Sequence, residues 1–308
     1  MKKFSTVIGD EISVASHFLQ QGEVVGIPTE TVYGLAANAL NDDAVLKIFS
    51  AKNRPHFDPL IVHTHNVNEI YKYVNDIPPL ARVLMKTFMP GPLTLLLKKK
   101  ELIPDLVTSG LKKVAIRIPS HPMALKLLQQ LDFPLAAPSA NPFGYISPTS
   151  AQHVYDQLQE KIPYILDGGT ATVGMESTIV GFENDDVIIY RLGGVAIEEI
   201  EKIIKRKVQL EINSSANPAA PGSLKSHYAP MKNLIIREFD DLIIGKQNTG
   251  VIAFDKYVTS VVKENQILLS HTGDLNEAAK NLFAAMRKLD ASNVEEIIAV
   301  KFPDEGLG

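Results

Sequence analysis

The stretch that decides the fold class is EVVGIPTETVYGLAANALNDDAVLKIFSAKNRP, residues 23–55. It opens with an apolar run of strand length at residues 24–27 and passes into a segment of threonine, glutamate and glycine. A helix follows, which Asn41 or Asp42 can start and Pro55 closes off. A buried strand that leads through a polar segment into an amphipathic helix is typical of α/β proteins.

The same alternation of strands and helices extends outward to about residue 195. Helices are predicted near residues 12–19, 122–131, 149–158 and 197–204, and Asp10 is the expected cap of the first one. About eight strands are predicted, at residues 24–27, 60–62, 93–97, 114–118, 135–137, 164–166, 178–180 and 187–190. So many strands in one region favour a single open, twisted mixed sheet over two small domains.

A second, smaller α/β unit is predicted beyond a linker. Residues 213–223 consist of asparagine, serine, alanine, proline and glycine and include no aromatic residue. This composition is typical of an interdomain linker. Beyond them, strands are predicted at residues 234–236, 251–254 and 297–300, with a helix at 274–289. We therefore expect a first domain at residues 1–207, a linker at 208–231 and a second domain at 232–308.

The composition of the 308 residues excludes several classes of protein. The chain has 31 basic and 35 acidic residues, a net charge of -4, and no cysteine, which removes disulfides, thiolate metal sites and cysteine nucleophiles. Its apolar runs fall far short of the ~20 residues that cross a bilayer, so we expect a cytoplasmic protein with no membrane partner. Phosphate-loop, dinucleotide-binding, zinc-protease and serine-hydrolase motifs are absent from the sequence.

Three polar segments interrupt the α/β pattern, and the first follows the strand at residues 24–27. It contains Thr29, Glu30 and Thr31. Because ligands of open α/β sheets bind beyond the carboxyl ends of strands, these two hydroxyls and the carboxylate could grip a small polar substrate. A helix N-cap explains the same residues equally well.

The other two segments carry groups suited to phosphate. Lys52 and Arg54 lie at the predicted end of a helix, where they could hold a polyphosphate or simply complement the helix C-terminus. Ser139 and Asn141 lie between prolines, with Ser147 a little further on. They could bind phosphate or ribose oxygens, and the alternative is a turn with an Asx cap.

Two arginines are predicted to be buried in or at the end of strands. Arg117 lies inside the apolar strand at residues 114–118, and Arg191 ends the strand at residues 187–190. A buried arginine needs an anionic partner, and a ligand carboxylate or phosphate and an internal ion pair are both candidates.

Two other kinds of site are weaker interpretations. Ser139, His63 and Asp167 could form a catalytic triad, but no spacing supports their meeting. His63 and His65 point to one face of a strand but supply only two metal ligands. No protein metal site is predicted.

Many short motifs, taken together and in order along residues 1–195, resemble those of the YrdC/Sua5 family. They are GIPTETVYGLAANA, KIFSAKNRP, PLIVH, MPGPLTLLL, VAIRIPSHP, LAAPSANP, ISPT, DGG, ESTIV and RLGG. The later APGSLKSHYAP resembles the linker of the longer, two-domain Sua5 type. The resemblance implies a catalytic YrdC-like domain, a linker that closes over the active site, and a small Rossmann-like Sua5 domain.

The resemblance also implies a reaction. It is the synthesis of L-threonylcarbamoyladenylate from L-threonine, bicarbonate and ATP with release of pyrophosphate. The product would pass to the machinery that makes N6-threonylcarbamoyladenosine (t6A) at position 37 of tRNAs reading codons that begin with A. Mg²⁺ is expected with the ATP, held largely by phosphate oxygens, with no prosthetic group. Weak RNA binding is a further expectation.

Site residues are carried over where this sequence matches the family's motifs. Residues implied to bind ATP are Lys52, Arg54, Asp58, Lys113, Ser139, Asn141, Ser147, Arg191 and Tyr228, of which Lys52, Arg54, Ser139 and Asn141 are the expected catalytic residues. Residues implied to bind threonine are Thr31, His63, Arg117, Ala137 and Ser177.

Three features of this chain depart from the family pattern or qualify it. Asp58 stands where many relatives have asparagine, and a carboxylate approaches phosphate only through a metal or water. Lys113 matches a position that contacts ATP through its backbone. The sequence ends at Gly306, Leu307 and Gly308, where relatives continue into a helix, so the second domain is expected to be truncated.

Two rival functions share the fold. One is an RNA-binding module, which the net negative charge disfavours as the sole role. The other is a carbamoyl-adenylate-forming domain like that of hydrogenase maturation proteins, which use carbamoyl phosphate. The Sua5-type linker and the absence of cysteine disfavour that alternative.

Overall fold

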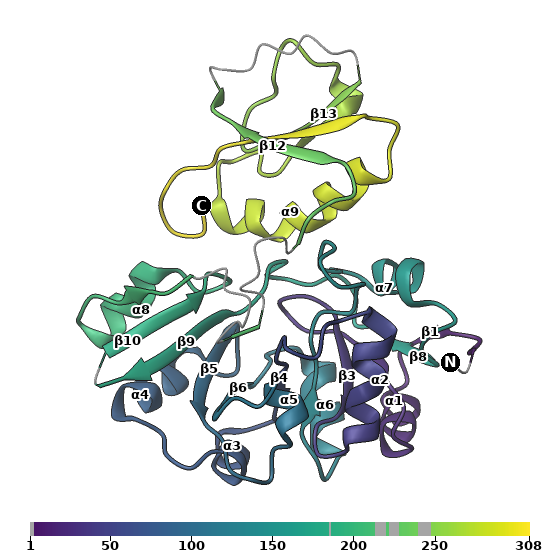
Figure 1. The fold of residues 1–308 in the computed structure, drawn as a ribbon. Helices are drawn as coiled ribbons and strands as arrows, with labels where there is room; N and C mark the ends of the chain where they lie inside the picture. The colour runs from purple at the N-terminus through teal and green to yellow at the C-terminus, as the bar shows by residue number, and fades with distance from the viewer. Residues whose placement is uncertain (1–2, 185, 213–219, 222–227, 240–247) are drawn as a thin grey trace.

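The computed structural model describes residues 3–184, 186–212, 220–221, 228–239 and 248–308, which form two separate sheets (Figure 1). The large sheet has eleven strands in the order β1-β8-β2-β3-β7-β4-β6-β5-β9-β10-β11. These strands are β1 (Val7–Gly9), β2 (Val25–Ile27), β3 (Gly34–Asn38), β4 (Ile61–His63), β5 (Leu93–Lys98), β6 (Lys113–Arg117), β7 (Leu135–Ala136), β8 (Tyr164–Leu166), β9 (Thr178–Glu183), β10 (Asp186–Arg191) and β11 (Gln209–Leu210).

Helices cover the large sheet between its strands. They are α1 (Ile12–Gln20), α2 (Asp42–Lys52), α3 (Val67–Tyr73), α4 (Pro79–Phe88), α5 (Asp105–Thr108), α6 (Pro122–Gln129), α7 (Ala151–Leu158) and α8 (Ile197–Ile204). The helix α2 begins as its sequence predicts, because the Asn41 side chain accepts a hydrogen bond from the backbone N–H of Ala44.

The large sheet is mixed, as predicted. Strand β4 runs parallel to β6, with His63 opposite Arg117, and antiparallel to β7. Strand β5 runs antiparallel to β6 and parallel to β9, with Leu93 opposite Thr178. These registers place the carboxyl ends of β4 and β6 next to the amino ends of β5 and β9.

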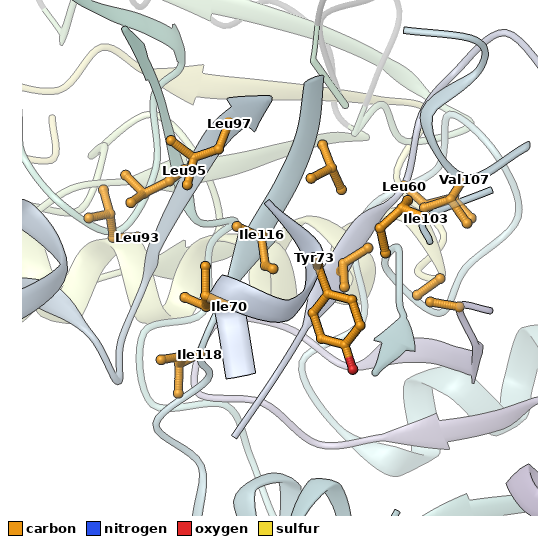
Figure 2. Close-up of a cluster of buried hydrophobic side chains, with 14 of the residues drawn as sticks. Leu60, Ile70, Tyr73, Leu93, Leu95, Leu97, Ile103, Val107, Ile116 and Ile118 are labelled. Carbon is orange, nitrogen blue, oxygen red and sulfur yellow. The ribbon is translucent and has the colours of Figure 1, made fainter. Parts of the chain in front are cut away.

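The two faces of the central strands have different surroundings. Because side chains alternate along a strand, Leu93, Leu95 and Leu97 of β5 point to one face with Ile116 of β6, into the main hydrophobic core (Figure 2). The intervening positions build a smaller apolar cluster on the other face, which includes Ile61, Leu96, Ala115 and Ile179. The functional site described below continues from this second face.

The structure adds elements that the sequence analysis missed. Strands β1, β3 and β11 were not predicted, and β3 has glycine and alanine in place of the β-branched residues typical of strands. Its pairing with β2 and β7 overrides that weak propensity. Helices α3, α4 and α5 were also missed, although Asn66 caps α3 and Pro79 opens α4.

The expected cap of the first helix was wrong. The N-cap of α1 is Glu11, and its side chain makes no capping hydrogen bond. The helix therefore starts one position later than Asp10 would place it, and its stability comes from burial of Ala15 and Leu19. Gly22 follows its end with a positive φ of 71°, as expected for a residue that terminates a helix.

The small sheet has four strands, all parallel, in the order β12-β15-β13-β14. They are β12 (Asn233–Arg237), β13 (Thr249–Ala253), β14 (Gln266–Leu268) and β15 (Glu296–Val300), with a short 3-10 helix η2 (Lys263–Asn265). Helix α9 (Leu275–Asp290) lies between this sheet and the first domain (Figure 1). Strand β14 was not predicted.

Most of the predicted linker lies outside the described residues. Of the segment at 213–223, the structure describes Ala220 and Pro221. Among the described residues, no helix is long and apolar enough to span a membrane.

Candidate active site

A pocket opens on the second face of the large sheet, where Ile61 and His63 of β4 lie on the same side as Arg117 of β6. The described residues that line it are Thr29, Thr31, Val32, Gly34, Arg54, Ile61, His63, Arg117, Ala137, Pro138, Ser139, Glu176, Arg191, Pro221 and Tyr228. The pocket therefore combines residues beyond the strand ends, where the sequence analysis expected a ligand, with residues on the sheet face. Polar groups at the strand ends meet side chains that stand on the sheet face.

Arg117 is held in place by the segment that follows β2. Its Nη2 forms an ion pair with Glu30 Oε1 at 2.5 Å, and its Nη1 donates to the Thr31 hydroxyl at 2.9 Å. Glu30 also accepts a hydrogen bond from the backbone N–H of Ser120. The Thr31 hydroxyl is 2.8 Å from that of Thr29. The internal ion pair foreseen as an alternative for Arg117 thus exists, and the guanidinium still borders the pocket.

Arg117 retains bonding capacity toward a ligand. Its Nε makes no hydrogen bond with any described residue, although the side chain is only 3% exposed. A buried donor without a partner is costly, and an anion in the pocket would satisfy it.

Arg191, at the end of β10, lines the pocket, and Ser177, just before β9, contacts it. The Ser177 hydroxyl is 2.7 Å from that of Thr94 and accepts a hydrogen bond from Arg191 Nη2 at 3.0 Å. Arg191 Nη1 donates to the hydroxyl of Tyr228 at 3.3 Å. One guanidinium therefore connects the sheet to the part of the linker that borders the pocket.

Glu176 joins Arg191 to the Ser147 segment. Its carboxylate accepts a hydrogen bond from the Ser147 hydroxyl at 2.7 Å and lies 3.7 Å from Arg191 Nη2. Among the described residues that line the pocket, Glu176 is the one carboxylate.

Lys52 supports the loop that contains Ser139 and Asn141. Its ammonium donates to the backbone carbonyls of both residues at 2.5 Å. The side chain is 1% exposed, and burial followed by the charge of Arg54 holds its pKa well below the usual value. Lys52 thus contacts the backbone of this loop, and Ser139 lines the pocket in front of it.

Arg54 and Asp58 form a second buried ion pair, at 2.8 Å between Nη2 and Oδ2. Arg54 also donates to the carbonyl oxygens of Asp58 and Pro59. The chain can turn sharply at the end of α2, before Arg54, because Asn53 adopts the left-handed backbone conformation. In this structure Asp58 is therefore the counterion of Arg54.

His63 is a neutral imidazole in this environment. Burial and, secondarily, the charge of Arg117 lower its pKa to about 3. Its Nδ1 is 3.1 Å from the carbonyl oxygen of Ile61, an arrangement in which Nδ1 is the protonated nitrogen.

Three guanidinium groups, of Arg54, Arg117 and Arg191, and three carboxylates, of Glu30, Asp58 and Glu176, surround the pocket. The amine of Lys52 lies beside them as a further nitrogen donor. Among the described residues no group of three or more histidine, cysteine, aspartate or glutamate side chains could hold a metal ion. The three guanidinium groups and the unpartnered Nε of Arg117 make the pocket suited to an anionic ligand.

The structure brings together most of the residues predicted from the sequence. Eight of them line the pocket: Thr31, Arg54, His63, Arg117, Ala137, Ser139, Arg191 and Tyr228. Five more contact the pocket-lining residues or their loops: Lys52, Asp58, Asn141, Ser147 and Ser177. Lys113 lies at the opposite end of β6 from Arg117 and pairs with Glu183 at 2.7 Å, so the structure does not bring it to the pocket.

Glu176 was missing from the predicted site, and Glu30 was predicted as a substrate contact and not as the counterion of Arg117. The signal for both was present, because two arginines in apolar strands require buried counterions and each glutamate adjoins a predicted site residue, Thr31 or Ser177. Which glutamate pairs with which arginine depends on strand register and could not be predicted from the sequence.

The fold and this arginine-lined pocket define a two-domain protein with a YrdC-type catalytic domain. Residues 17–193 match the Sua5/YciO/YrdC family model, described as "Telomere recombination". Residues 195–308 match the model described as "Threonylcarbamoyl-AMP synthase, C-terminal domain".

Similar proteins cover nearly the whole chain. The threonylcarbamoyl-AMP synthase of Pyrococcus abyssi is 40% identical over 97% of this chain and 91% of its own length. That of Bacillus subtilis is 39% identical over 97% and 90%. A crystal structure of P. abyssi Sua5 complexed with L-threonine is 38% identical, with a TM-score of 0.90 over 98% of this chain and 94% of that one. The chain belongs to the Sua5-type threonylcarbamoyl-AMP synthase family, which consists of enzymes of the transferase type.

Proposed function

We propose that this protein synthesises L-threonylcarbamoyladenylate from L-threonine, bicarbonate and ATP and releases pyrophosphate. The observation that carries the proposal is that three guanidinium groups, of Arg54, Arg117 and Arg191, border one pocket. A substrate pair with a carboxylate at one end and a triphosphate at the other needs cations at both ends. The names of the relatives and the threonine complex of P. abyssi Sua5 support the same substrate.

Arg117 is the proposed partner of the threonine carboxylate, with Thr31, His63, Ala137 and Ser177 around the rest of the amino acid. The unpartnered Nε of Arg117 supports this assignment. The neutral imidazole of His63 has its other nitrogen available as an acceptor for the substrate amine, because Nδ1 is engaged with a backbone carbonyl.

The proposed chemistry needs no side-chain nucleophile. The threonine amine and bicarbonate form a carbamate with loss of water, and a carbamate oxygen attacks the α-phosphorus of ATP. The bond from that phosphorus to its bridging oxygen breaks, and pyrophosphate leaves. Positioning and cations at the phosphate oxygens supply most of the catalysis of such a transfer.

Arg54, Arg191 and the loop of Ser139 and Asn141 are proposed to hold the nucleotide, with Lys52, Ser147 and Tyr228. Lys52 contributes by fixing the loop through its two hydrogen bonds to backbone carbonyls. Mg²⁺ enters as the substrate complex with ATP, and Glu176 is the pocket-lining carboxylate that could meet it through water. Lys113 has no proposed side-chain role, because it points away from this pocket.

The part of the linker at Pro221 and Tyr228 borders the pocket, which supports a covering role for it. Such a cover would exclude water from a mixed anhydride that hydrolyses readily. We propose that the product serves t6A formation at position 37 of tRNA in the cytoplasm, through a separate transferring machinery.

The test is pyrophosphate release from ATP and Mg²⁺, with L-threonine and bicarbonate present or omitted in turn, together with mass detection of the adenylate. Release that requires both substrates is expected, and L-serine should replace threonine poorly. Release with neither substrate, or use of carbamoyl phosphate instead, would contradict the proposal. Salt-sensitive RNA retention without threonine-dependent ATP use would favour the RNA-binding alternative.

A further inference from the structure

The second domain contacts the nucleotide side of the pocket at the short segment Tyr145–Ser147, in which Tyr145 forms an isolated β-bridge with Ala229. The segment contacts two parts of the site. The carbonyl of Tyr145 accepts a hydrogen bond from Asn141 Nδ2 at 2.8 Å, and the Ser147 hydroxyl donates to Glu176 at 2.7 Å. Its geometry therefore sets the positions of two residues proposed to hold ATP, Asn141 and Ser147.

Arg287 of α9 supplies hydrogen-bond donors to the backbone of this segment. Its Nε donates to the carbonyl of Ser147 at 3.2 Å, and its Nη2 donates to the carbonyl of Ile146. Arg287 is 8% exposed, and burial lowers its pKa to about 10, so it stays cationic at neutral pH. Backbone carbonyls outside helices and strands need such donors when they are buried.

A second contact fixes the same segment from the same helix. The Tyr145 ring lies 5.1 Å from the Arg287 guanidinium carbon, and its hydroxyl donates to Asp290 Oδ2 at 2.6 Å. Asp290 also accepts a hydrogen bond from the backbone N–H of Lys232, just after the linker. Burial, aided by Asp290, raises the pKa of Tyr145 to about 12, so the phenol remains a donor.

We infer that Arg287 is a positioning residue for nucleotide binding: from the second domain, it holds the Tyr145–Ser147 segment in the conformation that presents Ser147 and Asn141 to ATP. The inference rests on the proposed function. It gives the second domain a part in ATP binding through contacts that do not involve Tyr228.

The test compares Arg287→Met with Lys288→Met in the full chain. Both changes remove a cation from the same helix, but Lys288 is exposed. Calorimetry measures the affinity for a non-hydrolysable ATP analogue and, separately, for L-threonine. Because Arg287 makes charge-assisted hydrogen bonds to the segment, Arg287→Met should weaken analogue binding by about tenfold and leave threonine binding within about twofold. Lys288→Met should change neither.

Two more variants separate positioning from folding. Arg287→Lys keeps the charge but cannot reach two carbonyls in the same geometry, so it should recover only part of the affinity. Tyr145→Phe removes one hydroxyl and keeps the ring, and we expect analogue binding to weaken by about threefold in a chain that folds normally.

Three outcomes would overturn the inference. They are unchanged analogue binding in Arg287→Met, an equal loss of both ligands in step with a lower folded fraction, and full rescue by Arg287→Lys. A native chain that binds no ATP analogue and releases no pyrophosphate would overturn the proposed function itself, and the inference with it.

Discussion

Arg117 and Glu30 form a buried pair that complicates the simplest mutational test of the pocket. Both side chains are almost fully buried, so Arg117→Ala would leave a carboxylate without its counterion and cost about 3–5 kcal/mol of stability. We predict that Arg117→Ala raises the threonine KM and lowers the urea midpoint together.

The double variant Glu30→Gln with Arg117→Met separates these effects. This variant should recover most of the stability, because no buried charge is left unpaired. Its threonine KM should stay raised, because the cation is still missing. The corresponding change at the nucleotide side, Arg54→Met with Asp58→Asn, should raise the ATP KM and leave the threonine KM nearly unchanged. Equal effects of both double variants on both substrates would contradict the assignment of the two ends.

The lowered pKa of His63 leads to a second prediction, which concerns the stability of the protein at acid pH. Its pKa is about 3 in the folded protein and near 6.5 in an unfolded chain, so between these values the unfolded chain binds a proton that the folded one does not. Stability should therefore fall as the pH drops through this window, by up to about 1.4 kcal/mol per pH unit from this group. Urea unfolding of His63→Asn between pH 6.5 and 4 should show a shallower slope. An unchanged slope would mean that His63 titrates normally.

At the level of single residues, the sequence predicted the kinds of groups well and their partners poorly. The pattern of Lys52 and Arg54, and of Ser139 and Asn141, correctly marked residues that the fold brings to one place. It could not show that Lys52 contacts backbone carbonyls or that Asp58 neutralises Arg54, since both facts depend on how the chain turns after α2.

Among the elements, the turn after β10 has the most direct effect on the site. A Cβ at Gly193 would lie 2.5 Å from the carbonyl carbon of Ser177 and 2.7 Å from the backbone nitrogen of Thr178, closer than real contacts allow. Gly193→Ala should push the start of β9 away from β10, displace Ser177 from Arg191 and weaken threonine binding, with a stability loss of about 1–3 kcal/mol. Threonine titration and urea unfolding check this. The adjacent Leu192→Ala, at a side chain 52% exposed, should have little effect.

Strands that are long and apolar were predictable as elements, but their role in the site was not. Residues 93–97 contain both core leucines and Thr94, which contacts Ser177 on the other face. A run in which nearly every residue is apolar does not show by periodicity which face meets the core. Only the order of strands in the sheet reveals that Thr94, Arg117 and Ser177 share a face with the pocket.

Considered as a whole, the molecule joins two sheets through one apolar cluster. Val32 and Ile146 of the first domain pack in this cluster with Phe283, Met286 and other residues of the second. Val32 also lines the pocket, and the Phe283 ring stacks on Tyr228 at 5.8 Å. A ligand that fixes the pocket is thus expected to stabilise both domains together.

Phe283→Ala tests this coupling. The side chain is 7% exposed, and its loss should cost about 3–5 kcal/mol, much of it from the contact between domains. We therefore expect the native chain to unfold in one cooperative transition and Phe283→Ala to unfold in two calorimetric transitions. ATP and threonine should raise the melting temperature of only the transition from the first domain. Phe302→Ala is the control, because Phe302 packs edge-to-face against Phe254 inside the second domain. It should lower stability while ligands still raise the melting temperature of the whole chain. If Phe283→Ala instead unfolds in one transition that both ligands shift as in the native chain, contacts other than this ring couple the domains. The hydrogen bonds of Arg287 and Asp290 to the Tyr145–Ser147 segment would then be the main connection between the domains.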